Sequence, residues 1–566
     1  MWESGGRRGV AMGAPLRQVK GVGEASSARL RKEAPRRRTS GLSTPSLRRD
    51  GRFSAASGEL WTPFSSIRSP GPAPLPPRRP LRSRTTTRRP SNTTQRGKGE
   101  GFNAAKHRVG DWHPKPERVS GTALQRGLGR MVTKTGRVLI LGSGFGGLYA
   151  ALRLQKLLRR ERDVEVLLIN RENFFSFTPM LHEVAASDLD LTHIVNPVRK
   201  LLSRVKFFLG DVEAVDLTRQ TVTVSHGSDH HRHDLDYDQL VIALGCTTNF
   251  YGLPGLEESA LTMKSLGDAI ALRNRLIQNL EEADTECAAK AGLRESLTTF
   301  VVAGGGFAGV ETLASINDFA REALRFYPHL RPQDLRMVLV HSGQTILPEL
   351  DPKLGRYAAR KLEMRGVELR LGTRVLGVSK EGVALSDGTH VPTQCLVWTA
   401  GTSPHPLLET LGCPKQAGRL LTDDHLQVVG HPGVWAIGDC AFIPGPDGKP
   451  YPPTAQHALR QGRVLAENVA AALRGKAGRA FAFNTIGQLA SIGRRAGVAQ
   501  IFGLRFSGFL AWWMWRTIYL SKLPRTEKKL RVMIDWTLDL LFSKDIVQYI
   551  TVKSPSISHR DNAGPS

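Results

Sequence analysis

The feature that most constrains the fold is a glycine-rich turn that occurs twice in the same sequence context. Its first copy reads Gly142-Ser-Gly-Phe-Gly-Gly147 and follows the apolar run Val138–Leu141. Its second copy reads Gly304-Gly-Gly-Phe-Ala-Gly309 and follows the apolar run Thr299–Ala303. An apolar strand, a G-x-G-x-x-G turn and a helix in this order are typical of a dinucleotide-binding site. Two copies predict two dinucleotides in one chain.

Each glycine of the turn has its own physical role. The first allows a tight bend, the second lets the backbone approach a pyrophosphate, and the third lets helix and strand pack closely. The N-terminus of the following helix faces the anion. We therefore expect six glycines to hold the two dinucleotides: Gly142, Gly144 and Gly147 at the first turn, and Gly304, Gly306 and Gly309 at the second.

Charge is unevenly distributed along the 566 residues. The formal net charge is +28, and residues 1–130 hold 28 of the 79 Lys and Arg residues but only 8 of the 51 Asp and Glu residues. This segment is rich in Arg, Pro, Ser and Gly and has no hydrophobic periodicity, so we expect it to be disordered. Three interpretations stay open: a true start at Met131, an organelle-targeting segment, or a basic arm for nucleic acid. For the folded part we expect no nucleic-acid partner.

The cysteines give no sign of a disulfide framework or a metal centre. The chain has five of them, and none forms a C-x-x-C pair: Cys246, Cys287, Cys395, Cys413 and Cys440. A reducing compartment fits this pattern. The loop 227–234 is rich in His and Asp, but no regularly spaced ligands accompany it, so we interpret it as a solvated hairpin tip. No metal site is predicted.

The C-terminal part changes character. Residues 506–520 are strongly aromatic, and residues 528–542 have helical periodicity. No apolar run reaches the roughly 18–20 residues of a membrane-spanning helix. Trp and basic residues beside an apolar face favour a membrane interface, and the alternative is a helix packed on the core or on a second subunit. We expect Trp512, Trp513 and Trp515 to contact the membrane, so that replacing them with Ser releases the protein.

The order of the motifs predicts an α/β fold. It has two Rossmann-like dinucleotide-binding domains, the second inserted in the first, followed by a C-terminal membrane-associating helical segment. The predicted boundaries are 1–130 for the basic extension, 131–296 and 406–500 for the two parts of the first dinucleotide-binding domain, 297–405 for the second, 501–552 for the membrane-associating region and 553–566 for a disordered tail.

Further motifs narrow the family. Asn173-Phe-Phe-Ser-Phe-Thr178-Pro179-Met-Leu follows the second strand, and Val397-Trp-Thr-Ala400-Gly401 ends the second domain. Ala436-Ile-Gly438-Asp439 precedes Pro452-Pro-Thr-Ala-Gln456-His-Ala-Leu-Arg-Gln461. Together with the Trp-rich C-terminus, these motifs resemble type II NADH:quinone oxidoreductase, a single-chain flavoprotein of the pyridine nucleotide-disulfide oxidoreductase superfamily, over about residues 135–550.

The resemblance implies a role for each motif. The first turn would bind FAD, with Asn170, Thr178, Pro179, Gly438 and Asp439 as further contacts. The second turn would bind NADH, with Ala400 and Gly401 bordering the stacked nicotinamide and flavin. Glu311 and Gln456 would be catalytic, Glu311 on the nicotinamide side and Gln456 at the quinone end of the flavin, beside Gln461.

Three residues depart from the family pattern. The acidic residue expected after each second strand is replaced by Asn170 in the first half and by His341 in the second. Without a carboxylate at His341, discrimination between NADH and NADPH is weakened. Arg460 takes the place of the second Gln of the quinone motif, which leaves the quinone type open.

The resemblance implies a non-proton-pumping respiratory enzyme. It would transfer a hydride from NADH to FAD and electrons to a membrane quinone. The expected protein is a homodimer, peripheral on the cytoplasmic face of the cell membrane, and an organelle membrane is the alternative location. Alternatives are a soluble NAD(P)H:acceptor flavin reductase, a sulfide:quinone oxidoreductase-like enzyme and a flavin-bound redox sensor.

Overall fold

The computed structural model describes residues 136–285 and 291–549, so the predictions for residues 1–130, Cys287 and residues 553–566 lie outside them. Its first sheet is parallel throughout, in the strand order β21-β9-β1-β2-β5. The apolar runs that predicted buried strands form its centre, because both faces of these strands are covered. The bounds are Gly136–Leu141 (β1), Val164–Asn170 (β2), Lys206–Leu209 (β5), Gln239–Ile242 (β9) and Val434–Ala436 (β21).

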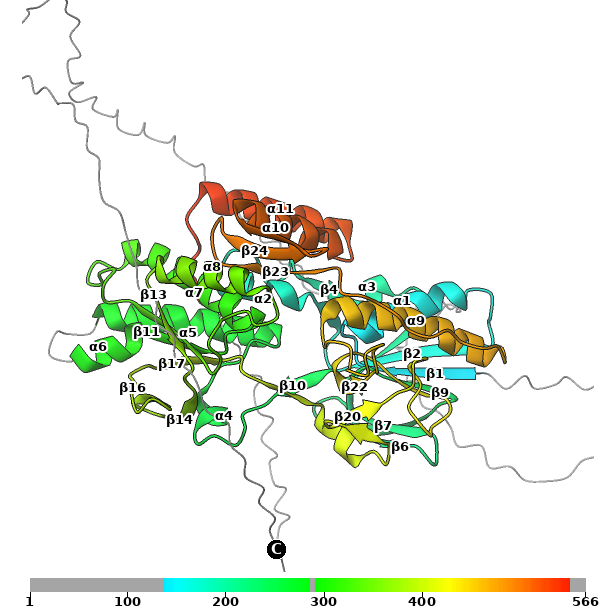
Figure 1. Cartoon of the computed structure of the whole chain (residues 1–566). Helices are drawn as coiled ribbons and strands as arrows, with labels where there is room; N and C mark the ends of the chain where they lie inside the picture. Colours follow the sequence, from blue (N-terminus) through cyan, green and yellow to red (C-terminus); the bar gives the residue numbers. More distant parts are fainter. Residues whose placement is uncertain (1–135, 286–290, 550–566) are drawn as a thin grey trace, which may run out of the picture. The chain divides into compact units, whose positions relative to one another are not determined.

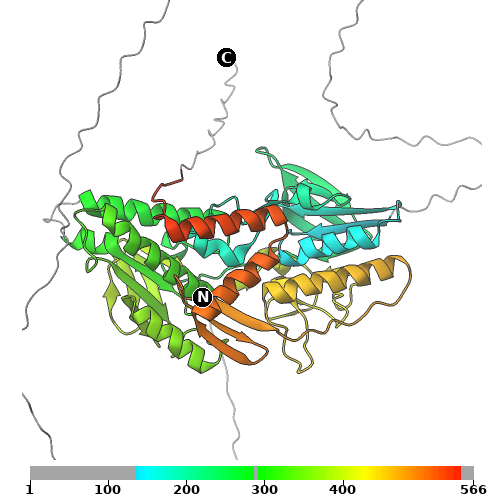
Figure 2. The same cartoon turned by 90° about the horizontal axis from the view of Figure 1, so that it is seen from above.

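Two helices that are far apart in the sequence lie side by side next to this sheet (Figures 1 and 2). They are α1, Phe145–Leu157, and α9, Ala455–Leu473. Small residues let the two backbones approach closely, since a Cβ added to Gly462 would lie 2.3 Å from the Gly146 carbonyl oxygen. The helix α9 begins at Ala455, so Gln456 lies in its first turn.

The second sheet is also parallel, in the order β13-β12-β11-β17. Its strands are Thr299–Ala303 (β11), Arg336–His341 (β12), Val367–Leu371 (β13) and Cys395–Trp398 (β17). The helices of this domain are Leu266–Thr285 (α5), Ala291–Thr298 (α6), Phe307–Ala323 (α7) and Pro352–Glu363 (α8), and a small antiparallel sheet consists of Val375–Ser379 (β14), Gly382–Leu385 (β15) and His390–Val391 (β16).

The chain crosses between the two sheets on one pair of antiparallel strands. It leaves the first sheet through β10, Cys246–Thr248, and returns through β18, Thr402–Pro404 (Figure 1). The first sheet is then completed by β21 on its edge, after the whole second sheet has been built. This topology confirms the predicted fold class, with one nucleotide-binding domain inserted in the other.

A separate antiparallel sheet is attached to the first domain. A three-stranded sheet consists of Asp211–Asp216 (β6), Thr221–His226 (β7) and His231–Asp236 (β8). The prediction of a loop over residues 227–234 is therefore wrong at its C-terminal half, because β8 pairs with β7 from His231 onward. A short strand, Val195–Pro197 (β4), is followed by a single helical turn, Val198–Leu201 (α3).

The C-terminal part forms a hairpin sheet covered by two helices (Figure 1). The strands are Gly487–Ser491 (β23), Gly497–Ile501 (β24) and Leu504–Gly508 (β25), and the helices are Phe509–Lys522 (α10) and Thr526–Leu541 (α11). Within the described ranges, no helix is both long and apolar enough to cross a membrane.

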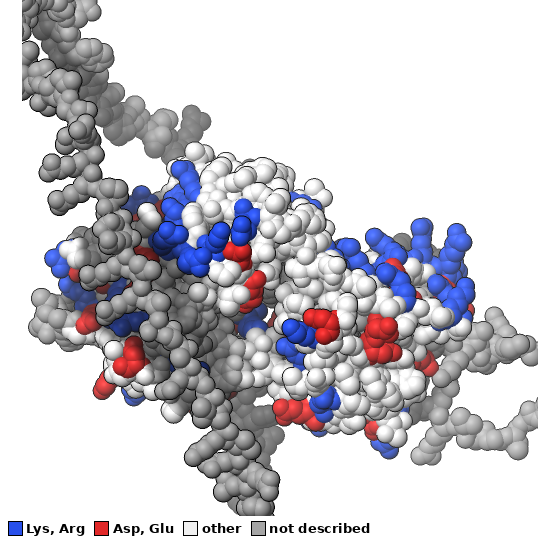
Figure 3. All heavy atoms as spheres, in the orientation of Figure 1, with Lys and Arg blue, Asp and Glu red and all other residues white. Residues whose placement is uncertain are grey.

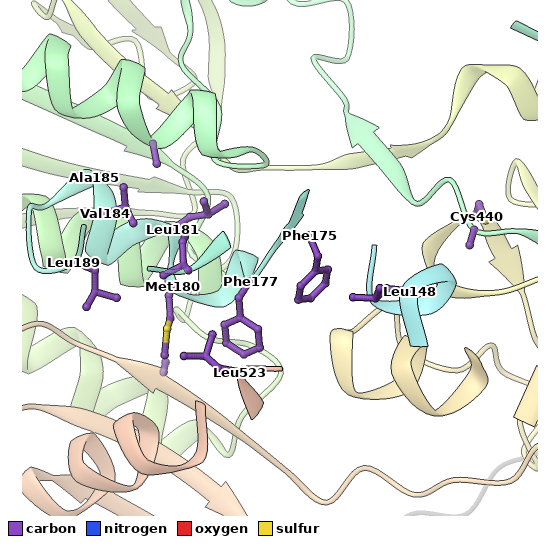
Figure 4. Close-up of a cluster of buried hydrophobic side chains, with 14 of the residues drawn as sticks. Leu148, Phe175, Phe177, Met180, Leu181, Val184, Ala185, Leu189, Cys440 and Leu523 are labelled. Atoms are coloured by element: carbon purple, nitrogen blue, oxygen red, sulfur yellow. The ribbon is translucent and has the colours of Figure 1, made fainter. Parts of the chain in front are cut away.

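The C-terminal helices are fixed to the first domain by a shared core. Figure 4 shows Leu523, which follows α10, beside Phe177 and Met180. These two residues flank the Thr178–Pro179 turn, which forms the short helix η1, Thr178–Met180, ahead of α2, Leu181–Ala185. The C-terminal elements are therefore part of the same core as the motif that follows β3, Phe174–Ser176.

This packing corrects the expected membrane anchor. Trp515 is fully buried and Trp512 is 7% exposed, whereas Trp513 is 53% exposed. The triple replacement with Ser would therefore damage the core as well as the surface. The exposed apolar residues of the C-terminal helices, including Phe542 directly after α11, are Phe509, Leu510, Trp513, Leu530, Met533, Ile534, Leu538, Leu540, Leu541 and Phe542.

Candidate functional site

The first glycine turn has the shape that its sequence predicts. Gly142 has φ +97°, a conformation that favours glycine. A Cβ on Gly147 would lie 1.9 Å from the Gly142 carbonyl oxygen, so only glycine fits there. In contrast, no described heavy atom lies within 4 Å of the place that a Cβ on Gly144 would take. The side of the turn that should receive a pyrophosphate is therefore open.

The second glycine turn repeats this geometry. Gly304 has φ +121°, and a Cβ on Gly309 would lie 1.8 Å from the Gly304 carbonyl oxygen. Around Gly306 the nearest atom to such a Cβ is a carboxylate oxygen of Glu349, 3.6 Å away. Both turns open at the carboxyl ends of parallel strands, where α/β folds bind nucleotides.

The two halves also match at the residue that ends the second strand of each sheet. The Oδ1 atom of Asn170 accepts a hydrogen bond from the Ser143 N–H at 2.9 Å. In the second half, Nδ1 of His341 accepts one from the Gly305 N–H at 3.1 Å. Burial lowers the pKa of His341, which keeps the ring neutral and able to accept. Each turn is thus fixed by a neutral acceptor where the family pattern has a carboxylate.

The carboxyl end of β21 brings several predicted cofactor contacts together. Gly438 has φ +74° and starts a short 3₁₀ turn that includes Asp439. The half-buried Asp439 carboxylate accepts a hydrogen bond from the Cys246 thiol at 3.1 Å, and the Lys264 ammonium donates to that sulfur at 3.2 Å. These groups lie on the same sheet edge as the first glycine turn, because β21 and β1 both flank β9.

Gln461 is placed differently from the prediction of a quinone contact. Its side chain is 3% exposed, and its Oε1 atom accepts a hydrogen bond from the Gly438 N–H at 2.9 Å. The amide therefore supports the turn at the end of β21.

The end of the second domain lies against the crossing strands. Gly401 has φ +133°, and the hydroxyl of Tyr251 lies 2.5 Å from the place that its Cβ would take. The Asn249 N–H donates to the Gly401 carbonyl oxygen at 3.3 Å. Ala400 is partly buried in a second apolar cluster around β17. A small residue at Gly401 thus lets Tyr251 close over this junction.

Glu311 lies near the N-terminus of α7, and its carboxylate points toward the C-terminal elements. Its Oε1 atom accepts hydrogen bonds from the Ser491 N–H at 3.0 Å and from Nε1 of Trp515 at 2.9 Å. The side chain is 8% exposed, and burial raises its pKa to about 8. Its contacts with β23 and α10 differ from the predicted orientation toward the nicotinamide.

Two buried titratable residues beside Glu311 were missed by the sequence reasoning. Nε2 of His182 lies 4.0 Å from the Glu311 Oε1 atom, while its Nδ1 is 2.9 Å from the Ser315 hydroxyl. Burial lowers the pKa of His182 to about 3, so the ring is neutral. Burial also raises the pKa of Glu183 to about 8, although Arg516 opposes this shift. Both directly follow the Thr178–Pro179 motif, which was the available signal.

Gln456 and Glu311 contact the two ends of the same strand. The Gln456 amide donates to the Gly487 carbonyl oxygen at 3.2 Å, at the start of β23, whereas Glu311 bonds to Ser491 at its end. Four residue steps along a strand span roughly 13 Å. The strand β23 therefore connects α9 of the first domain with α7 of the second.

Arg460, the departure from the quinone motif, lies one turn after Gln456. Its guanidinium donates to the Gln456 carbonyl oxygen at 2.8 Å and stacks over the ring of Phe483, with the central carbon 4.0 Å from the ring centroid. This cation–π contact orients the side chain.

Thr178 and Pro179 are accessible enough to contact a cofactor. Thr178 is exposed and Pro179 is half-buried, while the residues on either side are buried. The two side chains are therefore held by the core in Figure 4 without being part of it.

The four described cysteines do not favour thiolate chemistry, because burial raises the pKa of each thiol. Burial raises the pKa of Cys395 to about 12 and that of Cys440 to about 11. The described cysteines are all reduced. An enzyme that carries sulfur on its cysteines needs reactive, accessible thiolates, and the buried Cys395, Cys413 and Cys440 do not meet this requirement.

Comparisons with known proteins agree with this geometry. A family model described as pyridine nucleotide-disulphide oxidoreductase matches residues 136–462, and one described as NDH2 C-terminal domain matches residues 486–545. A probable NADH dehydrogenase of Dictyostelium discoideum is 31% identical over 74% of this chain and 92% of its own length. The type II NADH:quinone oxidoreductase Ndh of Mycobacterium tuberculosis is 32% identical over 72% of this chain and 89% of its own length.

A solved structure shows the same fold. The structure of NDH2 from Plasmodium falciparum in complex with NADH has a TM-score of 0.67 and 19% sequence identity. It covers 73% of this chain and 100% of the Plasmodium chain.

Proposed function

The chain belongs to the type II NADH:quinone oxidoreductase family, and from this membership and the site described above we propose that it oxidises NADH and reduces a membrane quinone with FAD as its cofactor. The observation that carries the proposal is the pair of matching glycine turns, one in each domain, both open at the carboxyl ends of parallel strands. One turn serves the resident cofactor and the other the substrate nucleotide.

The residues of the first domain fit FAD. The open side of Gly144 leaves room for a pyrophosphate, and the N-terminus of α1 presents its N–H groups there. Asn170, Gly438 and Asp439 lie at the same sheet edge, with Thr178 and Pro179 as the proposed contacts to the ring system. When bound, FAD supplies hydride acceptance from NADH and electron transfer to the quinone.

The residues of the second domain fit NADH. Gly304, Gly306 and Gly309 form the phosphate turn, and Ala400 and Gly401 lie at the junction with the first domain. A small residue there lets a nicotinamide approach the flavin side. The domain bounds predicted from the sequence remain proposals.

The nucleotide preference depends on His341. Replacing it with Glu would place a carboxylate beside the adenosine ribose, where it accepts a hydrogen bond from NADH and repels the 2′-phosphate of NADPH. We expect the ratio of kcat/KM for NADH over NADPH to rise about tenfold. The control is His390→Glu, on an exposed residue of β16. If the ratio of kcat/KM for NADH over NADPH were unchanged in His341→Glu, the adenosine ribose would not bind beside residue 341.

The quinone side is proposed to lie along β23. Gln456 and Glu311 bond to its two ends, so both proposed catalytic side chains depend on this strand. Because burial raises the pKa of Glu311 to about 8, the carboxyl group holds a proton at neutral pH. It can therefore supply the proton that quinone reduction requires beyond the hydride.

We propose that the exposed apolar side of α10 and α11 contacts the membrane. In Figure 3 the surface of these helices is largely uncharged, with Lys and Arg side chains gathered at one edge. Apolar residues flanked by cations suit an interfacial position. A homodimer and a location on the cytoplasmic face of the cell membrane remain predictions.

A surface variant tests this contact. Trp513→Ser with Leu541→Ser removes two side chains that are 53% and 71% exposed, without touching the buried Trp512 and Trp515. We expect at least tenfold weaker binding to lipid vesicles, with unchanged reduction of the flavin by NADH. Leu376→Ser, on a 52% exposed residue of β14, is the control. Unchanged vesicle binding would assign the apolar side to a protein interface.

The half-reactions test the proposed function directly. NADH added without oxygen should bleach the flavin absorbance, and a short-chain quinone added next should restore it. If NADH bleaches the flavin but the quinone fails to restore it, the protein is a reductase for another acceptor. If NADH binds without bleaching, the protein is a redox sensor.

A further inference from the structure

A hollow of about 370 Å³ lies between α8 and the C-terminal hairpin, and no assigned function uses it. Its wall includes three cations and a phenol, and none of its lining residues is acidic. The lining residues are Tyr357, Lys361, Met364, Arg365, Arg495, Ala496, Gly508 and Phe509. Such a wall attracts an anion.

Two of the three cations are available to a ligand. Arg365 is bonded to the Asp318 carboxylate at 2.9 Å. Lys361 and Arg495, in contrast, make no ion pair with any carboxylate of the described residues. The Lys361 ammonium lies 6.0 Å from the ring centroid of Tyr357, which places it on the wall of the hollow.

Arg495 is held there by an unusual backbone conformation. Its φ is +58°, in the left-handed region that favours glycine, at the turn between β23 and β24. A residue with a long cationic side chain therefore occupies a position where glycine would be less strained. The turn presents this guanidinium to solvent at the rim of the hollow.

The rim also belongs to the apolar surface proposed to face the membrane. Phe509, 60% exposed, lines the hollow and begins α10, and the exposed Leu510 and Trp513 follow on the same helix. Met364, 77% exposed, lies on the opposite wall. An anion that enters here thus has apolar contacts beside its charged group, as a lipid headgroup with its acyl chains requires.

We propose that this hollow binds the phosphate headgroup of an anionic phospholipid, with Lys361 and Arg495 on the phosphate and Met364 and Phe509 against the start of the acyl chains. The inference rests on the membrane contact of the proposed function and adds a lipid class to it. A bound headgroup would orient the protein on the membrane, because it would hold the edge of the apolar surface beside α8 at the level of the lipid headgroups.

A second basic hollow shows why charge alone is not sufficient. It measures about 400 Å³ and is lined by Arg321, Arg325 and Arg494, but also by Glu322. The Glu322 carboxylate is bonded to Arg325 at 2.8 Å and to Arg494 at 3.1 Å. Two of its three cations are therefore already compensated, whereas in the α8 hollow only Arg365 is paired with a carboxylate of the described residues.

The test is vesicle binding of the full chain with the double variant Lys361→Gln, Arg495→Gly. Glycine suits the positive φ of residue 495, so this change removes the cation without adding strain. On vesicles with about one third phosphatidylglycerol we expect about 30-fold weaker binding than the wild type, since each basic residue near an anionic surface contributes about fivefold. On pure phosphatidylcholine vesicles the two proteins should bind equally.

A charge-matched control separates the hollow from net charge. Lys380→Gln with Lys449→Gln removes two exposed cations in loops of the two nucleotide-binding domains and should bind like the wild type. Equal weakening by the control would assign the effect to net charge and overturn the proposal. Inorganic phosphate that binds as tightly as water-soluble phosphatidylglycerol would assign the hollow to a free anion and also overturn it.

Two further outcomes separate this inference from the proposed function. Quinone-dependent NADH oxidation in detergent should be unchanged in the double variant, which shows that it folds. If the wild type binds neither kind of vesicle, both the membrane contact and the lipid site are wrong. If it binds both kinds equally, only the lipid site is wrong.

Discussion

Protein carrying Gly147→Ala is expected to lose nearly all of its flavin and to unfold at a lower temperature than the wild type. A Cβ at this position would lie 1.9 Å from the Gly142 carbonyl oxygen, so α1 must move away from β1. Forcing extra volume into a packed region costs about 1–3 kcal/mol. The same movement displaces the N–H groups that would face the pyrophosphate. Flavin absorbance per chain and a thermal unfolding curve measure the two effects.

Gly144→Ala is the matched control for that variant. Outside Gly144 and its chain neighbours, no described atom lies within 4 Å of its added Cβ, so the flavin-free variant should unfold at the same temperature as the flavin-free wild type. The Cβ does enter the space assigned to the pyrophosphate, and flavin affinity should therefore fall, with only the stabilisation by bound flavin lost. Full flavin content in both variants would show that the cofactor does not use this turn.

Glu311→Gln is expected to lower quinone-dependent turnover by about a hundredfold, because the amide cannot donate the proton that a positioned general acid supplies. Reduction of the flavin by NADH should be retained, since the side chain bonds to β23 and α10. Stopped-flow measurement of the two half-reactions separates these effects. A slower first half-reaction with a normal second one would move Glu311 to the nicotinamide side.

The same variant should change the dependence of stability on pH. Burial raises the Glu311 pKa to about 8, whereas an exposed Glu titrates at 4.5. Between these two values the unfolded chain releases a proton that the folded chain keeps, so wild-type stability falls as pH rises through this window. Glutamine does not ionise and carries no such cost. At pH 8 the free energy of unfolding of Glu311→Gln should therefore exceed that of the wild type by on the order of a few kcal/mol.

The control for this profile is Glu363→Gln, on an exposed residue at the end of α8. Because this side chain is exposed, its replacement should leave the pH dependence of the free energy of unfolding unchanged. If the free energy of unfolding of Glu311→Gln and of the wild type changed with pH in the same way, Glu311 would be ionised in the folded protein.

The parts of the fold that follow from local rules could be predicted from the sequence. Both glycine turns form as expected, because a positive φ at Gly142 and Gly304 and the contacts of Gly147 and Gly309 depend on residues only a few positions apart. The insertion of one domain in the other follows from the order of the two copies. The helix α11 also presents its predicted apolar face.

The parts that depend on long-range packing could not be predicted. Trp515 is in an aromatic run that suggests a membrane surface, yet it is fully buried because its Nε1 bonds to Glu311, 204 residues earlier. Gln461 was expected at the quinone, but its amide holds the Gly438 turn. His182 and Glu183 carry no motif of their own, and their importance becomes visible only when α2 packs beside α7.

The most direct test of the proposed function is the steady-state rate of NADH oxidation by the purified full chain, with and without a short-chain quinone. We predict that the quinone accelerates NADH oxidation strongly, with one NADH consumed for each quinone reduced. A rate that does not depend on the quinone, in protein that contains its flavin, would contradict the assignment of the chain as an NADH:quinone oxidoreductase.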